Sequence, residues 1–368
     1  MLGLANTVSS GSTLESLYSI TLDGTDDYID LGTGISLGTG DFTISLWVKT
    51  ADFHDKAMIG EFELASPQDF WYFGASNQDP PTLLFRHRVA DDDAVSIYTG
   101  SSISLDDHKN AWTHIAISAD RDGKIEGYVN GVKDTADVDA ADPVVNLTIP
   151  ANTQIGLLGT SNFAFQIDEV SIWNTPLDSN TIEAIYNKGA NHDLTSGLSI
   201  GTGPLVAYYR MGNGTFDDKA NGVVHDQHAP GFGSELVTSW TNTDFDEFTS
   251  SGSNITEMVS GADKDNCYAS ATTTSGKTYK LQFVCSQNIT AQVRISSSVN
   301  LTGGLVVLSN PTSGLNTAYF RADASYTKIG FFANDTFTDT QISDFTFKEL
   351  NGIPGLTSGG PTFSSDVP

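Results

Sequence analysis

Asp-Phe-Thr-Ile-Ser-Leu-Trp-Val-Lys, residues 41–49, carries the clearest strand signal in this chain. Every second side chain is apolar, so a strand here places four of them on one face: Phe42, Ile44, Leu46 and Val48. Similar strand patterns return at 112–118 and, after the turn 120–123, at 124–129. Asn130-Gly131 follows at once, a dipeptide typical of tight hairpins. These patterns predict antiparallel β-structure.

The composition agrees with an all-β protein of two domains. The chain has 368 residues, and domains of roughly 150–200 residues predict two units. Its 35 glycines, with abundant Ser, Thr, Asn and Asp, indicate many turns. The net charge of −27 argues against binding to nucleic acid or to an anionic membrane. No run approaches the roughly 18 apolar residues of a membrane-spanning helix, so we expect no membrane insertion.

The apolar alternation changes phase at Asp168-Glu169. Residues 163–167 keep their apolar side chains on one face, whereas Val170 and Ile172 fall in the opposite phase. Either a β-bulge lies at Asp168-Glu169 or both faces of the strand are buried.

One helix is predicted, with Asp178 or Ser179 as N-cap and Gly189 after its end. The second half of the chain reads as strands again, beginning with the alternating residues 277–285. Strand signals about 10–15 residues apart suit a second, smaller β-sandwich. We therefore predict an N-terminal arm at 1–17, a first domain at 18–230, a second at 235–350 and an irregular C-terminal arm at 351–368.

Four segments in order resemble a laminin-G-like (concanavalin A-like) jelly roll, over about residues 20–190. They are residues 22–29, 42–48, 112–116 with the 128–131 hairpin, and 167–173. Residues 275–283 and 342–350 more weakly resemble carbohydrate-binding-module sandwiches. The resemblance implies an N-terminal jelly roll followed by a second β-sandwich, with irregular arms at both ends.

The first residues predict no signal peptide, and this pairing of domains in an acidic chain is similar to structural proteins of marine tailed bacteriophages. The resemblance implies a non-enzymatic virion protein, a head decoration or a tail or fibre component, assembled in the host cytoplasm. Its partners would be other virion proteins and copies of itself, bound through the arms, with weak adhesion to host surface glycans. The alternative is a secreted glycan-binding module or a glycan-active enzyme of concanavalin-like fold.

A calcium site is one implication of the resemblance, because such jelly rolls often bind Ca²⁺ through Asp carboxylates. Asp23, Asp26 and Asp27 cluster in the first strand and turn, and Asp168 lies at the phase change. If the first and last strands are neighbours, Asp168 converges on Asp23. A hard cation needs six to eight oxygen ligands. The alternative is that these are ordinary turn residues.

Trp71 and Tyr72 are the candidate glycan-binding residues. They belong to the aromatic run 70–73, which alternates over both faces of a strand. One face could stack on a sugar ring while the other is core, and the alternative is that both faces are core. Asp91–Asp93 and Asp106–Asp107 are acidic loops that could form a second cation site.

No catalytic residues are predicted. Glycanases of concanavalin architecture carry Glu-x-Asp-x-x-Glu, and the nearest approach here is Glu61-Phe-Glu63, which lacks the Asp and the third Glu. We therefore expect no enzymatic activity.

The two cysteines, Cys267 and Cys285, flank a turn at Ser275-Gly276. They lie either on one hairpin or in opposite sheets of the sandwich. A chain assembled among reducing thiols favours free cysteines, so we predict two reduced, buried thiols.

Overall fold

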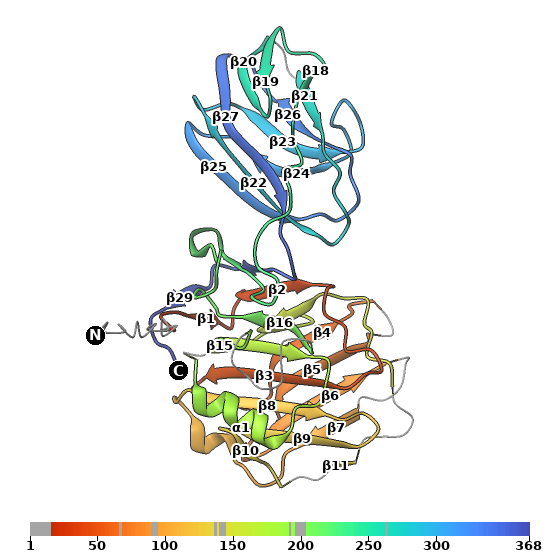
Figure 1. Cartoon of the computed structure of the whole chain (residues 1–368), viewed down its shortest axis with the longest axis vertical. Coiled ribbons are helices and arrows are strands. Elements are labelled where there is room, and N and C mark those ends of the chain that lie inside the picture. The colour runs from red at the N-terminus through yellow and green to blue at the C-terminus, as the bar shows by residue number, and fades with distance from the viewer. Residues whose placement is uncertain are drawn as a thin grey trace, which may run out of the picture.

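The computed structural model describes residues 16–65, 68–89, 95–135, 138–139, 145–190, 193–195, 204–261 and 264–368. Two β domains are stacked along the long axis of the molecule (Figure 1). The described residues contain one α-helix, α1 (Ser179–Lys188), and two short 3₁₀ turns, η1 (Leu105–His108) and η2 (Lys219–Asn221). None of these helices is long and apolar enough to cross a membrane. The predicted all-β class, a jelly roll with a second sandwich, is confirmed.

The first domain is a sandwich of two large sheets, here called sheet A and sheet B. Sheet A runs β10 (Val132–Lys133), β9 (Lys124–Val129), β8 (Thr113–Ala119), β3 (Phe42–Lys49), β15 (Ala164–Trp173), β1 (Ser19–Asp23) and β29 (Thr362–Ser364), with β11 (Val138–Asp139) beside β9 and β16 (Leu205–Tyr209) beside β15. Sheet B runs β17 (Val223–Val224), β28 (Gly355–Ser358), β2 (Tyr28–Gly32), β12 (Thr153–Ile155), β4 (Lys56–Phe62), β5 (Phe70–Ala75), β6 (Leu83–Arg88) and β7 (Val95–Thr99). A small hairpin, β13 (Leu157–Leu158) and β14 (Ser161–Asn162), stands beside them.

The main core lies between sheets A and B. The alternating residues of β3 point into it, and Ile44 is opposite Ile117 of β8. Trp71 and Phe73 of β5 enter it from sheet B. The alternation in β3 therefore has the predicted result, and its apolar face is buried in the core.

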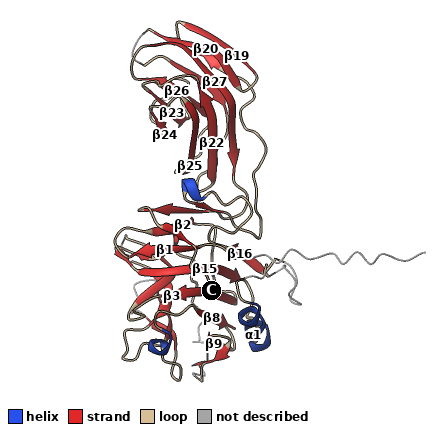
Figure 2. Cartoon of the chain, turned by 90° about the vertical axis from the view of Figure 1, so that its left-hand side faces the viewer, coloured by secondary structure: helices blue, strands red, loops and turns tan. Residues whose placement is uncertain are grey.

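Helix α1 covers the outer face of sheet A (Figure 2). The Asp178 carboxylate accepts a hydrogen bond from the Thr181 N–H, which caps the helix as predicted. Ile182 and Ile185 then pack on Trp173 and Tyr208 of the sheet. A second, smaller core thus lies between α1 and the outer face of sheet A.

A β-bulge lies at Asp168-Glu169, one of the two readings of the phase change. Asp168 is opposite Trp47 and Ser171 is opposite Ser45, so β15 has one residue more than β3 across this interval. Glu169 takes a positive φ of 49°. The extra residue turns the following part of β15 into the opposite phase.

The second domain is a sandwich of two five-stranded sheets. One, sheet E, runs β18 (Thr241–Asn242), β21 (Asn266–Ser270), β26 (Lys328–Ala333), β23 (Ala291–Ser296) and β24 (Leu305–Ser309). The other, sheet F, runs β19 (Glu247–Ser251), β20 (Asn254–Ser260), β27 (Phe337–Glu349), β22 (Thr278–Cys285) and β25 (Gly314–Arg321). Cys267 and Cys285 are both buried, as predicted, and they lie in opposite sheets instead of on one hairpin.

The prediction of an irregular C-terminal arm at 351–368 is wrong. After the second domain the chain returns to the first, where β28 inserts between β17 and β2 and β29 pairs with β1 at the edge of sheet A. The first domain therefore consists of 18–230 together with 351–368. Residues 1–15 of the predicted N-terminal arm lie outside the described residues, and Leu17 and Tyr18 donate their N–H groups to Asn213 Oδ1.

Candidate functional site

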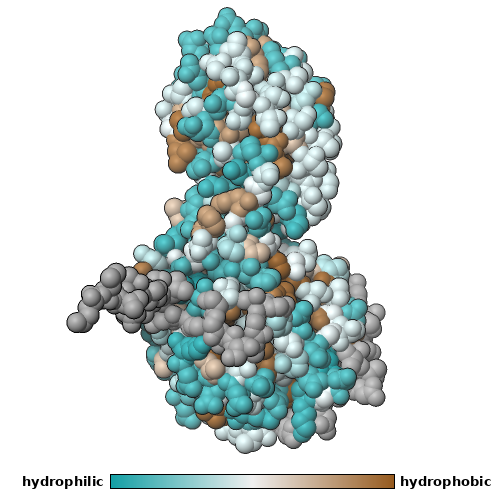
Figure 3. Space-filling view, in the orientation of Figure 1, coloured by the Kyte–Doolittle hydropathy of each residue, from teal (hydrophilic) through white to brown (hydrophobic). Residues whose placement is uncertain are grey.

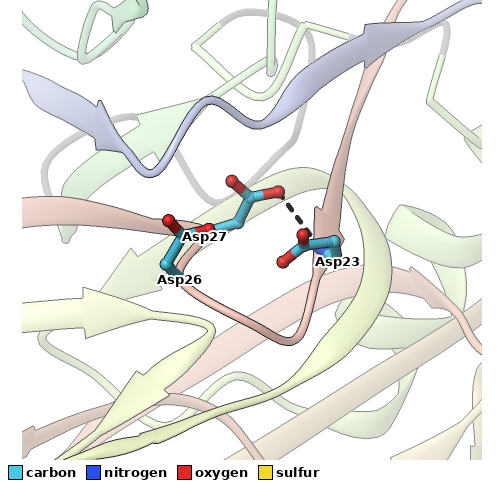
Figure 4. A group of neighbouring side chains, drawn as sticks. All are labelled: Asp23, Asp26 and Asp27. Carbon is cyan, nitrogen blue, oxygen red and sulfur yellow. Dashed lines mark hydrogen bonds between the residues drawn. The ribbon is translucent and has the colours of Figure 1, made fainter.

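Asp23, Asp26 and Asp27 form one cluster in the turn between β1 and β2, here called the acidic turn (Figure 4). One carboxylate oxygen of each lies within 4.8 Å of the others. Asp27 Oδ2 accepts the Asp23 N–H at 3.1 Å, and Asp23 Oδ1 accepts the Thr25 N–H at 2.7 Å. The structure thus brings together three of the four predicted cation ligands.

The electrostatics of the acidic turn suit a cation. Burial raises the pKa of Asp27, and the neighbouring Asp23 and Asp26 charges raise it further. The N–H of Thr25 lowers the pKa of Asp23. Three carboxylates supply part of the oxygen shell that Ca²⁺ requires, and backbone carbonyls or water would supply the rest. A second group, Asp41, Asp120 and Asp122, has the same carboxylate spacing.

Asp168 is not part of the acidic turn, so the predicted convergence is wrong. Strands β1 and β15 are neighbours, as expected, but their register places Asp23 opposite Ala164 and Ile20 opposite Ile167. Asp168 therefore lies four residues further along β15, a displacement of roughly 13 Å at about 3.3 Å per residue. The family resemblance implied that these two strands are neighbours, but it did not determine the register between them.

Asp168 instead belongs to a buried polar network at the β-bulge. Its Oδ2 accepts a hydrogen bond from Ser16 Oγ at 2.9 Å. Burial raises the pKa of both Asp168 and Glu169. Arg210 Nε donates to Glu169 Oε1 at 3.1 Å, and the Tyr208 hydroxyl donates to Glu169. The network ties the bulge of β15 to β16 and to the start of the described chain.

Trp71 faces the core and cannot stack on a sugar. Its side chain is 0% exposed and lies parallel to Phe85, with ring centroids 5.9 Å apart. Tyr72 points the other way, to the outer face of sheet B, where it packs with Phe70 in a separate cluster. All four aromatic residues of the run are buried, so the structure favours the alternative in which both faces of the strand are core.

The outer face of sheet B carries a line of three rings, here called the aromatic row: Phe62, Phe70 and Tyr72. Phe62 stacks on Phe70 at 5.8 Å between centroids, and Phe70 lies 6.0 Å from Tyr72. Phe62 is half-buried, whereas Phe70 and Tyr72 are 8% and 7% exposed. Leu158 of β13 and Phe163 pack against the same cluster, so Phe62 is the ring of the row most open to a ligand.

Two arginines flank the aromatic row on β6. Arg86 is opposite Tyr72 and Arg88 is opposite Phe70. The Arg88 guanidinium lies 5.3 Å from the Phe70 centroid, and the Gln68 carbonyl accepts its Nη2–H at 2.7 Å. Arg86 interacts with the Tyr72 hydroxyl, and its Nε is buried without a hydrogen-bond partner in the described chain.

Sequence analysis missed these arginines, although they carried a signal. Residues 83–88, Leu-Leu-Phe-Arg-His-Arg, place Arg86 and Arg88 at alternate positions of a strand. Recognising them required the pairing of β6 with β5, which is a long-range fact.

Glu61 and Glu63 do not form a glycanase pair. Glu61 is 1% exposed and faces the interior, where Thr153 Oγ1 donates to its Oε1 at 2.6 Å. Burial raises the pKa of Glu61 to about 7. Glu63 lies beyond the end of β4. A glycan on the outer face of sheet B could not reach the Glu61 carboxyl.

The sequence profile of the concanavalin A-like lectin/glucanases superfamily matches residues 23–183. The first domain has the concanavalin A-like lectin fold. We call it the lectin-like domain. A comparison with curated protein sequences gives no match.

Solved structures that are similar to this chain include a pentraxin and modules of two bacterial enzymes. The chain is 14% identical to a SAP-like pentraxin from Limulus polyphemus, over 46% of this chain and 82% of that one, with a TM-score of 0.34. It is 19% identical to domain 4 of an extracellular GH43 arabinanase from Geobacillus stearothermophilus, over 45% and 75%, with a TM-score of 0.35. It is 14% identical to the CBM40 module of a Ruminococcus gnavus IT-sialidase, over 45% and 95%, with a TM-score of 0.35.

Proposed function

We propose that the lectin-like domain binds glycans without cleaving them, through the aromatic row and Arg86. The observation that carries this proposal is the position of a guanidinium beside three rings on the outer face of sheet B. Aromatic rings stack on the apolar faces of sugars, and a guanidinium offers several N–H donors to hydroxyl or carboxylate oxygens. The outer face of sheet A is less suitable, because α1 covers it.

The non-catalytic part of the proposal rests on Glu61. Two-carboxylate hydrolysis needs an acid and a base or nucleophile on either side of the scissile bond. The Glu61 carboxyl faces the core, so it cannot take either role for a ligand on the outer face of sheet B.

Binding and turnover can be tested with one set of polysaccharides: laminarin, agarose and alginate. We expect the full chain to bind at least one of them and to release no reducing sugar from any. Phe62→Ala and Arg86→Gln should weaken the binding about tenfold. Arg294→Gln is the matched control, because Arg294 also lies over a ring, 3.9 Å from the Phe332 centroid, in the other domain. Unchanged affinity in Phe62→Ala and Arg86→Gln would contradict the site, and released sugar would contradict the non-catalytic role.

We further propose that the protein is a structural component of a phage particle, as head decoration or as part of a tail or fibre. The support is the resemblance of a jelly roll paired with a second sandwich in an acidic chain. Many copies on a particle would turn weak glycan contacts into firm adhesion. Co-sedimentation with assembled particles is the expected result, whereas free secreted protein with sugar affinity would favour the alternative of a secreted module.

A structural Ca²⁺ at the acidic turn is the remaining part of the proposal. Asp23, Asp26 and Asp27 would hold it, and its charge would offset their mutual repulsion. It would stabilise the connection of β1 to β2, with no part in chemistry.

A further inference from the structure

A row of cationic and aromatic side chains crosses sheet F where the two domains meet. Lys348 of β27 is opposite Lys280 of β22, and Lys280 is opposite Tyr319 of β25. Their neighbours in sequence, Tyr279, Phe320 and Phe347, fill the core, so the row lies on the outer face. Hydrophilic residues with a few hydrophobic ones cover this waist of the molecule (Figure 3).

The two lysines are unusual for this chain. Only 18 Lys and Arg residues stand against 45 Asp and Glu, and yet Lys280 and Lys348 face each other directly. Like charges at such positions destabilise a sheet. Neither lysine forms an ion pair with any residue that the structure describes. An anion bound between them would remove the repulsion.

Two phenylalanines border the row: Phe216, in the loop between β16 and β17 of the first domain, and Phe232, in the connection to the second domain. Lys280 Nζ lies 5.6 Å from the Phe232 ring centroid and 5.4 Å from that of Tyr319. Phe216 packs edge-on against Phe232 at 5.6 Å and is 52% exposed. We call Phe216, Phe232, Lys280, Tyr319 and Lys348 the junction surface. The exposed Phe216 ring offers an apolar face next to Phe232, the ring over which Lys280 lies.

A buried histidine lies against the two phenylalanines. His225 is 0% exposed, with its ring 6.0 Å from Phe216 and 5.3 Å from Phe232. Neither of its ring nitrogens has a hydrogen-bond partner among the described residues. Leaving buried polar atoms unpaired costs stability, so the packing of the two phenylalanines on this ring is held at some cost to the fold.

Polar side chains continue along the same face of sheet F. Two residues beyond Lys280, Gln282 is opposite Thr346 and Thr317 and donates to Thr317 Oγ1 at 3.2 Å. Amide and hydroxyl groups in this spacing suit the hydroxyls of a chain of sugars. One carboxylate of the region, Asp218, accepts the Tyr319 hydroxyl at 3.0 Å and so fixes that ring.

We propose that the junction surface binds an acidic polysaccharide, with a carboxylate or sulfate group between Lys280 and Lys348 and a sugar ring against Phe216. Charge complementarity selects the anion, because this pair is unneutralised in a chain of net charge −27. The exposed ring and the polar track favour a sugar chain over a simple ion. The site lies where the second domain meets the loop between β16 and β17 of the first, apart from the aromatic row, and does not depend on it.

The test measures binding of the full chain to alginate, which carries carboxylates, and to carrageenan, which carries sulfates, with laminarin as the neutral reference. We expect at least one acidic chain to bind, with affinity that falls as salt is added. The double variant Lys280→Gln/Lys348→Gln should weaken that binding about tenfold, and Phe216→Ala should weaken it as well. Lys328→Gln is the matched control, since Lys328 Nζ lies 5.6 Å from the Tyr268 ring on the opposite sheet.

Each outcome decides the proposal. If the double variant loses binding to alginate alone, the anion between the lysines is a carboxylate. If it loses binding to carrageenan alone, the anion is a sulfate. The proposal is overturned if acidic polysaccharides bind no tighter than laminarin, or if they bind the double variant as tightly as the original chain.

If binding falls only in Phe62→Ala and Arg86→Gln, the ligand occupies the aromatic row, and the junction surface is refuted while the proposed function stands. Tighter binding of single-stranded DNA than of either polysaccharide also refutes it. Unchanged melting temperatures of the variants confirm that they fold.

Discussion

Glu61 is a carboxyl group inside the core of the lectin-like domain, and it should make stability depend on pH. Burial raises its pKa from 4.5 to about 7. The folded chain therefore keeps a proton that the unfolded chain releases between these values, so the free energy of unfolding falls as the pH rises from about 4.5 to 7. At about 1.4 kcal/mol per pKa unit, the loss is about 3 kcal/mol.

Glu61→Gln should remove this share of the pH dependence. The Gln oxygen can still accept the Thr153 hydroxyl, and no charge has to be buried at high pH. We expect the variant to match the original chain at pH 5 and to exceed it at pH 8, in urea unfolding at both values. Asp168 and Glu169 act in the same direction in both chains, so the difference isolates Glu61. A Glu61→Gln curve parallel to that of the original chain contradicts the prediction, and Glu63→Gln serves as control.

Removing divalent cations should lower the melting temperature of the lectin-like domain. Without a cation, the three carboxylates of the acidic turn repel one another within 4.8 Å. We expect EGTA to lower the transition by about 2–4 °C, and Asp26→Asn to abolish the response. Asp335→Asn, a carboxylate of the second domain, should keep it. An identical melting curve with and without EGTA would show that the turn binds no structural cation.

Residue-level expectations succeeded where the signal was local. Asp23, Asp26 and Asp27 meet because one turn connects them. The prediction that Asp168 converges on Asp23 was wrong, because the position of Asp168 depends on the register between β1 and β15. The alternation of residues 70–73 predicted side chains on both faces of a strand. Only the pairing of β5 within sheet B shows that Trp71 points into the core between the sheets and Tyr72 to the other face.

At the scale of elements, β28 is the strand that closes sheet B around the inserted domain. It pairs with β17 on one side and β2 on the other, and Thr357 donates its N–H to the Gly222 carbonyl at 2.8 Å. Thr357→Pro removes this donor and its ladder hydrogen bond from the middle of a sheet and should cost about 1–3 kcal/mol. Thr357→Val keeps the N–H and should cost much less. Equal thermal unfolding of the two variants would show that β28 contributes little.

The strands that sequence analysis found are those with long alternation or a clear turn. β3, β8, β9, β15 and β22 were all visible, as was α1 through its Asp178 cap. β28 and β29 were not, because Gly-Leu-Thr-Ser and Thr-Phe-Ser are short and carry no extended apolar pattern. Their place depends on backbone pairing with β2 and β1, residues more than 300 positions earlier.

At the scale of the whole molecule, the second sandwich is an insertion in the first. The chain leaves the lectin-like domain after β17 and returns to it at β28, and these two strands are paired. Phe232 and Leu350 form an antiparallel bridge at the crossing, and Gly233 donates its N–H to the Glu349 carbonyl. Arg321 of the inserted domain pairs with Asp30 at 2.6 Å. Two connections side by side fix the second domain more firmly than one linker would.

This architecture predicts that each domain folds without the other. Replacing 234–349 by a short glycine turn keeps the Phe232–Leu350 bridge, so β17 and β28 can still pair. The lectin-like domain would lose the Arg321–Asp30 pair, a contact about 13% and 25% exposed and worth about 1 kcal/mol at most. We expect its thermal transition to remain cooperative and to fall by a few degrees.

The excised segment 233–350 keeps its own core around Phe283, Phe331 and Phe345 and should unfold as a separate transition. Circular dichroism melting of both pieces measures this. If the shortened chain shows no cooperative transition while 233–350 does, then the inserted domain is needed to hold β17 and β28 together, and the lectin-like domain is not an independent unit.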